Sequence, residues 1–183
     1  LEWLKKLTTL PLIVKGIRTA EDATLCLENG VDGLLISNHG GRQIDTTLAS
    51  IETLPEISIA AQGKMELYID SGIRSGSDIL KALALGAKAV FIGRPLFWGL
   101  AIGGSMGVRK VLSILITELD EAMRYSGISS IEHVDATILS LPKHMMVPRN
   151  VAIRKIKDLA LLLNQGKITK QVFQSNKAKL LQA

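Results

Sequence analysis

The sequence lacks several features that would mark a special class of protein. One cysteine among 183 residues excludes a disulfide framework and a cysteine metal cluster. No stretch approaches the roughly 18 consecutive apolar residues of a membrane span, and no secretory signal is visible. Aromatic residues make up 4%, without the interleaving with basic residues that stacks bases. The remaining composition, 47% apolar and 21% charged, is that of a globular domain with a sizeable core.

The excess of positive charge lies at the C-terminal end. Residues 1–148 carry 14 basic and 16 acidic residues, whereas residues 149–183 carry eight basic residues and one acidic residue. The net charge of +5 therefore describes an appended tail, and we expect no nucleic-acid partner. We expect residues 141–183 to form a C-terminal extension of basic amphipathic helices, at 152–163 and 169–181. These helices would close the domain, and a membrane-surface or partner-binding role is the alternative.

Four short apolar runs alternate with helical patterns. The runs lie at residues 12–15, 33–37, 67–70 and 89–93. Helical patterns lie at residues 19–29, 48–60, 75–85 and from about 108 to 124, the second interrupted by Pro55. This alternation predicts an α/β fold with a parallel sheet covered by helices.

The number of strands suggests half of a larger fold. A (β/α)8 barrel has eight strands and about 250 residues, and only four strands are predicted here. A self-contained doubly wound sheet is the alternative, but no glycine-rich phosphate turn follows the first strand. The chain opens with Leu1 in the middle of a pattern, so we expect upstream sequence to be missing.

Polar residues follow the second predicted strand directly, in the segment Ser37–Arg42. His39 can exchange a proton near neutral pH, and Arg42 can hold a carboxylate through two parallel hydrogen bonds. A base and an anion clamp three residues apart suit proton abstraction from a small carboxylic acid. A lone histidine would more often face solvent in a structural turn, but these neighbours favour a catalytic role.

The third and fourth predicted strands end in a possible phosphate site. Arg74 and Arg94 would supply charge, and Gly72 and Gly93 would expose backbone N–H groups. Loops after the last two strands of a barrel commonly bind phosphate, although either arginine alone is as often a surface charge. Lys15, at the end of the first run, either receives an anion or reaches solvent. The residues predict a phosphorylated cofactor or substrate beside a histidine base, and FMN and a sugar phosphate both remain open.

These motifs resemble the family of FMN-dependent 2-hydroxy acid oxidases and dehydrogenases, which includes glycolate oxidase, L-lactate dehydrogenase and mandelate dehydrogenase. The matching segments are residues 12–16, 37–45, 70–74, 81–87 and 93–95. The resemblance covers roughly residues 1–140, and its most specific part surrounds His39. It implies that these residues form the C-terminal half of a (β/α)8 TIM barrel, with the four strands as the fifth to eighth.

The resemblance also implies an activity, the oxidation of a 2-hydroxy acid to a 2-oxo acid. FMN would be the cofactor, and O2 or a redox partner would accept the electrons. His39 would be the base, and Arg42 would bind the substrate carboxylate. Lys15 would lie near the N1/O2 edge of the flavin, and Arg74, Gly93 and Arg94 would hold the phosphate. The implied FMN-binding residues are Lys15, Ser37, Asp70, Ser71, Gly72, Ile73, Arg74, Gly93 and Arg94; no metal is expected.

Two departures from the family pattern matter. Ser71 replaces a frequent glycine, a form that also resembles bacterial lactate and mandelate dehydrogenases and slightly favours a dehydrogenase. The first barrel half would supply substrate-binding tyrosines and the carboxylate partner of the histidine, so we expect a fragment that is inactive alone.

The resemblance implies a homo-oligomeric full-length parent. Two alternatives remain: a non-catalytic phosphate-binding half-barrel that pairs with another half, and a barrel isomerase of sugar phosphates.

Overall fold

The computed structural model describes residues 1–142, 145, 162–163 and 165–175. The chain forms two compact units, Leu1–Ser140 and Leu141–Ala183. In the second unit, residues 162–163 and 170–175 are helical, and Thr169 is not. Residues 152–161 and 176–181 of the two predicted basic helices lie outside the described residues. All elements and side chains discussed below belong to the first unit.

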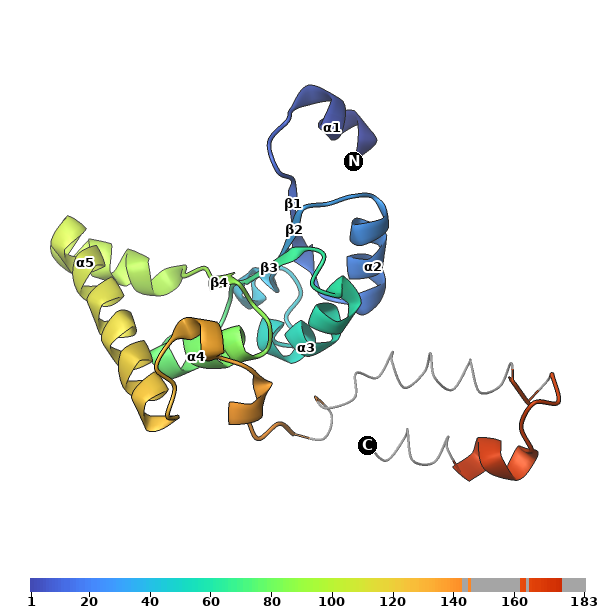
Figure 1. Ribbon diagram of the computed structural model, residues 1–183. Coiled ribbons are helices and arrows are strands. Elements are labelled where there is room, and N and C mark those ends of the chain that lie inside the picture. The colour runs from blue at the N-terminus through green and yellow to red at the C-terminus, as the bar shows by residue number, and fades with distance from the viewer. Residues whose placement is uncertain (143–144, 146–161, 164, 176–183) are drawn as a thin grey trace. The chain divides into compact units, whose positions relative to one another are not determined.

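The first unit is built on a four-stranded parallel sheet (Figure 1). Its strands are β1 (Ile13–Ile17), β2 (Gly33–Ile36), β3 (Glu66–Ile69) and β4 (Ala89–Val90). They lie in chain order, and each neighbouring pair is parallel. A doubly wound sheet changes direction at a switch point, and the described strands contain no such switch. The order is that of consecutive βα units of a barrel, as the sequence predicts.

Helices follow each strand. They are α2 (Ala20–Glu28), α3 (Ser50–Ala61), α4 (Gly76–Ala84) and α5 (Arg94–Tyr125), and α1 (Glu2–Leu7) precedes the sheet. Three short 3-10 turns are η1 (His39–Gly41), η2 (Ile131–His133) and η3 (Ala136–Ile138). Two of these helices have side-chain caps, because Thr19 and Ser75 accept hydrogen bonds from the backbone N–H groups of Asp22 and Asp78.

The fourth βα unit differs from the prediction. β4 is only two residues long, and α5 begins at Arg94 rather than near residue 108. Pro95, in the first turn, suits a helix start, but residues 96–102 are apolar on all sides and give no amphipathic signal. Pro55 is the sixth of the twelve residues of α3 and leaves the helix uninterrupted, although its ring removes one intrahelical hydrogen bond.

The long helix α5 is divided into two arms. By length and composition alone it is long and apolar enough to cross a membrane, which a search for an unbroken apolar run does not detect. Its backbone leaves helical geometry at Gly103 and Gly104, and the chain turns there (Figure 1). The arms pack at Gly99 and Gly107, where a Cβ atom on Gly107 would lie 1.9 Å from the carbonyl oxygen of Gly99.

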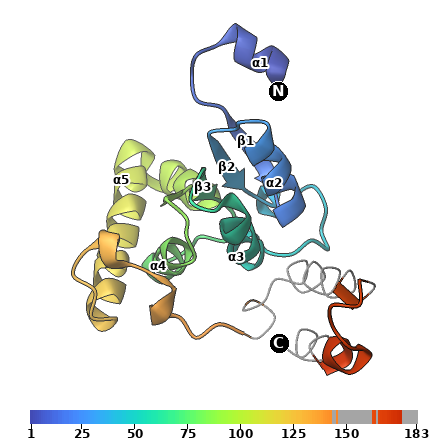
Figure 2. The same cartoon turned by 45° about the vertical axis from the view of Figure 1, so that its right-hand side comes forward.

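The core lies between the sheet and its helices. α2 and α3 pack side by side (Figure 2), and α4 packs against α5. Strand residues Leu34, Ile36 and Ile69 are completely buried, as are Leu54 and Ile57 of α3. Because side chains alternate along a strand, the neighbouring positions turn to the other face of the sheet. That other face is not covered by helices of the first unit, and Ile13 of β1, which lies on it, remains 50% exposed.

Candidate active site

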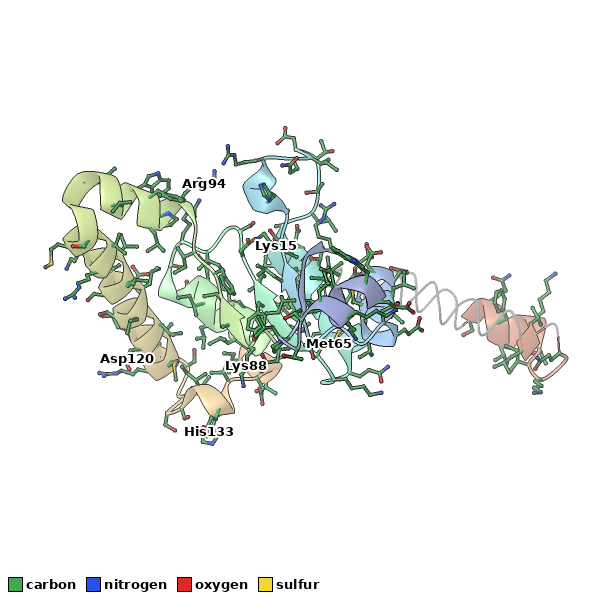
Figure 3. The ribbon with its side chains drawn as sticks, turned by 90° about the horizontal axis from the view of Figure 1, so that it is seen from above. Lys15, Met65, Lys88, Arg94, Asp120 and His133 are labelled. Carbon is green, nitrogen blue, oxygen red and sulfur yellow. The ribbon has the colours of Figure 1, made fainter. Side chains whose placement is uncertain are left out.

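The predicted site residues gather at one end of the sheet. Figure 3 shows Lys15 and Arg94 on the side where the strands end, whereas Met65 and Lys88, which precede β3 and β4, lie on the opposite side. A pocket of about 330 Å³ lies at this end. Every predicted site residue except Ser37 lines it, together with Gly40, Phe91 and Phe97.

Lys15 is held in place by two polar neighbours. Its ammonium group forms an ion pair with Asp70 and donates a hydrogen bond to Ser37 Oγ at 3.3 Å. A bulge in β1 at Gly16, with φ 95°, follows Lys15 and locally alters the pairing with β2. An ammonium group has three donors, so one remains for a ligand in the pocket.

Asp70 is a carboxylate at neutral pH. Burial raises its pKa, but hydrogen bonds from Lys15, Ser37 and Ser71, with the charge of Lys15, outweigh that effect and hold the pKa below its ordinary value. The pocket therefore contains one negative charge that already has a cation beside it.

His39 lies in a strained turn. It adopts φ 56°, and Gly40 and Gly41 follow with φ 67° and 72°. A non-glycine residue in this region costs on the order of 1 kcal/mol or more. The backbone N–H of His39 donates to the buried Ser37 Oγ at 3.0 Å, which helps to hold the turn, while the imidazole remains exposed.

Gly40 connects the His39 turn to two other loops. Its N–H donates to Ser71 Oγ at 2.9 Å, and its carbonyl oxygen accepts a hydrogen bond from Arg94 Nη2 at 3.2 Å. Ser71 in turn donates to Asp70 Oδ1 at 2.7 Å. The loops after β2, β3 and β4 are thus linked to one another without any ligand.

Position 72 favours glycine because of its backbone conformation, not because a side chain would lack space. Its φ is 83°, and a Cβ atom there would meet no other atom within 4 Å. Gly93, the N-cap of α5, has equally open surroundings. Both backbones are therefore accessible from the pocket, and the amino end of α5 adds the partial positive charge of a helix N-terminus.

The pocket is suited to anions. Four cations line it, Lys15, Arg42, Arg74 and Arg94, and Asp70 is the one acidic lining residue. The Arg74 guanidinium lies 5.2 Å from the centroid of the Trp98 ring and donates to the carbonyl oxygen of Ile73 at 3.2 Å. These contacts fix an arginine beside the start of α5 in a geometry that suits a phosphate.

A second pocket of about 240 Å³ adjoins the first through His39. Arg18, Ser37, Asn38, Gln43 and Thr47 also line it. Ser37 thus lines this smaller pocket, although the family resemblance implies that it contacts FMN.

Sequence reasoning missed the aromatic residues at the site. Phe91, Phe97 and Trp98 gave no separate signal, because Phe91 belongs to an apolar run and the other two lie in the undetected first arm of α5. His133 lies in η2 and does not line the pocket, and His144 lies outside the described residues. Among the described residues, no group of His, Cys, Asp and Glu is placed to hold a metal ion.

The chain is similar to known proteins over most of its length. Residues 1–141 match the family model of FMN-dependent dehydrogenases. The chain is 53% identical over 137 residues to 2-hydroxyacid oxidase 1 of Mus musculus, covering 75% of the chain and 37% of that protein. It is 51% identical over 141 residues to an L-lactate oxidase of Nostoc sp., covering 77% of the chain and 39% of that protein.

Solved structures agree with the sequence relatives. A mandelate oxidase mutant carrying a monooxide FMN adduct superimposes with a TM-score of 0.70 and 46% sequence identity. The match covers 73% of this chain and 42% of that protein, in agreement with the fold predicted for half of a barrel. The chain spans about two fifths of the length of the relatives that it matches.

Proposed function

The chain belongs to the FMN-dependent dehydrogenase family, and we propose that it carries the catalytic base and the cofactor phosphate site of an enzyme that oxidises a 2-hydroxy acid to a 2-oxo acid. The observation that carries this proposal is the meeting of His39, Arg42 and the phosphate-type arginines Arg74 and Arg94 in one pocket. Arg94 and Arg74 also contact Gly40 and Trp98, but folding gives no reason for His39 and Arg42 to lie in the same pocket.

The residues of the pocket fit FMN, the cofactor of the family. Arg74, Arg94 and the backbone at Gly93 would hold the phosphate at the amino end of α5. The remaining donor of Lys15 would stabilise negative charge at the N1/O2 edge of the flavin ring. The volume of about 330 Å³ lies at the lower end of the range of small-molecule sites, about 300–1,000 Å³. The other proposed contacts are Ser37, Asp70, Ser71, Gly72 and Ile73.

The chain's own residues would divide the chemistry between binding and proton transfer. Arg42 would hold the substrate carboxylate through paired hydrogen bonds. His39 would accept a proton from the substrate as its hydroxyl carbon is oxidised. FMN supplies the acceptor for the two electrons. The strained His39 turn, tied to Ser37 and the neighbouring loops, would keep the base beside the clamp.

Molecular oxygen is the final electron acceptor that we favour. The named relatives are a 2-hydroxyacid oxidase, an L-lactate oxidase and a mandelate oxidase. This agreement outweighs the slight signal for a dehydrogenase that Ser71 gives. The relatives differ in substrate side chain, so the family alone does not determine that part of the substrate.

Further βα units would complete the site. Among the described strands, β1 and β4 each have one unpaired edge, and unpaired edges of a sheet favour association with additional strands. We therefore expect this chain to be inactive alone. A non-catalytic phosphate-binding half-barrel is the second candidate, but phosphate binding gives no reason for His39 and Arg42 to lie together in the pocket. A homo-oligomeric parent stays a prediction.

Titration with FMN and riboflavin tests the phosphate site. Arg94→Ala should weaken FMN binding about tenfold or more, because a hydrogen bond to a charged group contributes about 1.5–3 kcal/mol. Riboflavin, which lacks the phosphate, should bind both proteins equally. Arg109→Ala is the matched control, since Arg109 is an exposed arginine on the same helix outside the pocket. A folded chain that binds neither compound, or an Arg94→Ala variant with unchanged FMN affinity, would refute the proposed phosphate site.

The catalytic assignment needs the completed barrel. The first four βα units of a relative, supplied as a separate chain, should restore formation of a 2-oxo acid. His39→Gln should abolish the reaction while FMN binding is retained. Undiminished turnover by that variant would exclude His39 as the base.

A further inference from the structure

The second pocket contains an arginine for which the family chemistry gives no role. Arg18 lies between β1 and the Thr19 cap of α2 and is half-buried. The ion pairs among the described residues are Lys15–Asp70 and Asp120–Arg124, and no hydrogen bond joins the Arg18 side chain to a described residue. Partial burial of a guanidinium that pairs with no described residue is unfavourable, so binding of an anion at Arg18 would be stabilising.

We propose that Arg18 binds a second carboxylate of the substrate, so that the enzyme acts on 2-hydroxy dicarboxylic acids. The inference rests on the proposed function, because it takes His39 and Arg42 as the base and the first carboxylate site. It adds the chemical class of the substrate side chain.

The shared histidine connects the two pockets. His39 lines both, whereas Arg42 lines the first alone and Arg18 the second alone. Because the two pockets meet at His39, a substrate whose carboxylate is held by Arg42 and whose reacting carbon is beside His39 would extend its side chain into the second pocket. That side chain would then end at Arg18.

The lining of the second pocket favours an acidic group over an apolar one. Arg18, Gln43, Asn38 and Thr47 bring a guanidinium, two amides and a hydroxyl, and no acidic residue lines it. Glu21 and Asp22, in the first turn of α2, are the nearest acids along the chain, and neither pairs with Arg18. The pocket, of about 240 Å³, accommodates a short chain ending in a carboxylate.

The experiment compares two ligands that differ in one charge. 2-Hydroxyglutarate and its 5-amide have nearly the same shape and differ in the charge at the distal end. Both are titrated into the purified chain and followed by isotope-edited NMR. The wild-type chain should bind the dicarboxylate about tenfold more tightly than the amide, the size of one charge-assisted hydrogen bond. Arg18→Gln should bind the two compounds equally, and Arg18→Lys, which keeps the charge, should retain most of the preference.

Arg42→Gln separates this inference from the proposed function. It should weaken both compounds alike, because both carry the first carboxylate. If Arg42→Gln changes nothing, or if a folded chain binds neither compound, the proposed carboxylate site fails and the inference fails with it. If Arg42→Gln acts as expected but Arg18→Gln keeps the preference, the second-carboxylate site alone is wrong.

A protein carboxylate is the competing source of the anion. If an acidic side chain from the added βα units paired with Arg18 in the completed barrel, the preference for 2-hydroxyglutarate in kcat/KM would be lost. Loss of the preference on completion would overturn the substrate assignment. A retained preference that Arg18→Gln removes would support it.

Discussion

Replacement of Ser71 tests how the loops of the site are held together. Ser71 adopts φ 71°, a conformation that favours glycine. Its hydroxyl nevertheless donates to Asp70 and accepts from the N–H of Gly40. The serine therefore combines a backbone cost with two hydrogen bonds, and two substitutions separate these effects.

The magnitudes follow from the two contacts. Ser71→Ala loses both hydrogen bonds and keeps the strained backbone. The bond to Asp70 contributes about 1.5 kcal/mol, the low end for a charged acceptor because Lys15 still pairs with it, and the bond from Gly40 about 0.5 kcal/mol. The loss should be about 2 kcal/mol. Ser71→Gly loses the same bonds but removes a strain of about 1 kcal/mol, so it should lose only about 1 kcal/mol.

Thermal unfolding followed by far-UV circular dichroism measures both variants. For a chain of this length, 1 kcal/mol corresponds to about 2–4 °C in Tm. Ser71→Ala should lower Tm by about 4–8 °C, and Ser71→Gly by about half as much. If the glycine variant is as unstable as the alanine variant, the strain argument is wrong. If Ser71→Ala is as stable as the wild type, the two hydrogen bonds do not hold the loops.

Three further predictions concern neighbouring parts of the site and α5. Asp70→Asn should lose about 1 kcal/mol of stability at neutral pH, since the ion pair is partly exposed. The pKa of Asp70 is lowered in the folded chain, so this contribution is fully present above the ordinary value of 3.8 and is lost as the pH falls through the folded value. Gly107→Ala should cost about 2–3 kcal/mol in urea unfolding, because its Cβ would lie 1.9 Å from the Gly99 oxygen. Trp98→Leu should weaken FMN binding about two- to fivefold and leave riboflavin binding unchanged, because the Arg74 cation–π contact is exposed and contributes about 0.5–1 kcal/mol.

Controls make these three results specific. A stability difference between the wild type and Asp70→Asn that stays constant from pH 7 to about pH 3 would contradict the pKa argument. Gly103→Ala should be tolerated, because a Cβ atom there meets no other atom within 4 Å; equal losses at both glycines would show that the arms of α5 do not pack as described. Trp3→Leu, on α1, should leave FMN affinity unchanged, and equal riboflavin loss in Trp98→Leu would show a general rather than a phosphate-specific effect.

The strands and the residues at their ends were predictable from the sequence because both signals are local. A short apolar run that ends just before His39, or at Asp70, places those side chains at one edge of a parallel sheet, whatever lies between. The start of α5 was not predictable from periodicity, because its first arm has no polar face. For the same reason the contact between Arg74 and Trp98 remained hidden.

The contacts between loops could not be predicted, since they depend on the register of the strands. Lys15 meets Asp70 across 55 residues of sequence, and Arg94 meets Gly40 across 54. The second pocket depends on register in the same way: Arg18 and Gln43 follow different strands and become neighbours only when β1 pairs with β2. Sequence patterns identify the chemical groups, and the sheet determines which groups meet.

These same contacts indicate that much of the site is organised before a ligand binds. The turn that carries His39 is joined to the β3 loop through Ser71 and to the start of α5 through Arg94. Each link involves the backbone of Gly40, so movement of one loop would strain the other two. Binding then requires little additional ordering of the loops, which lowers the entropic cost of association. It also means that a phosphate at Arg94 and a substrate at Arg42 would bind to one connected unit, and that weakening the Gly40 contacts should impair both sites together.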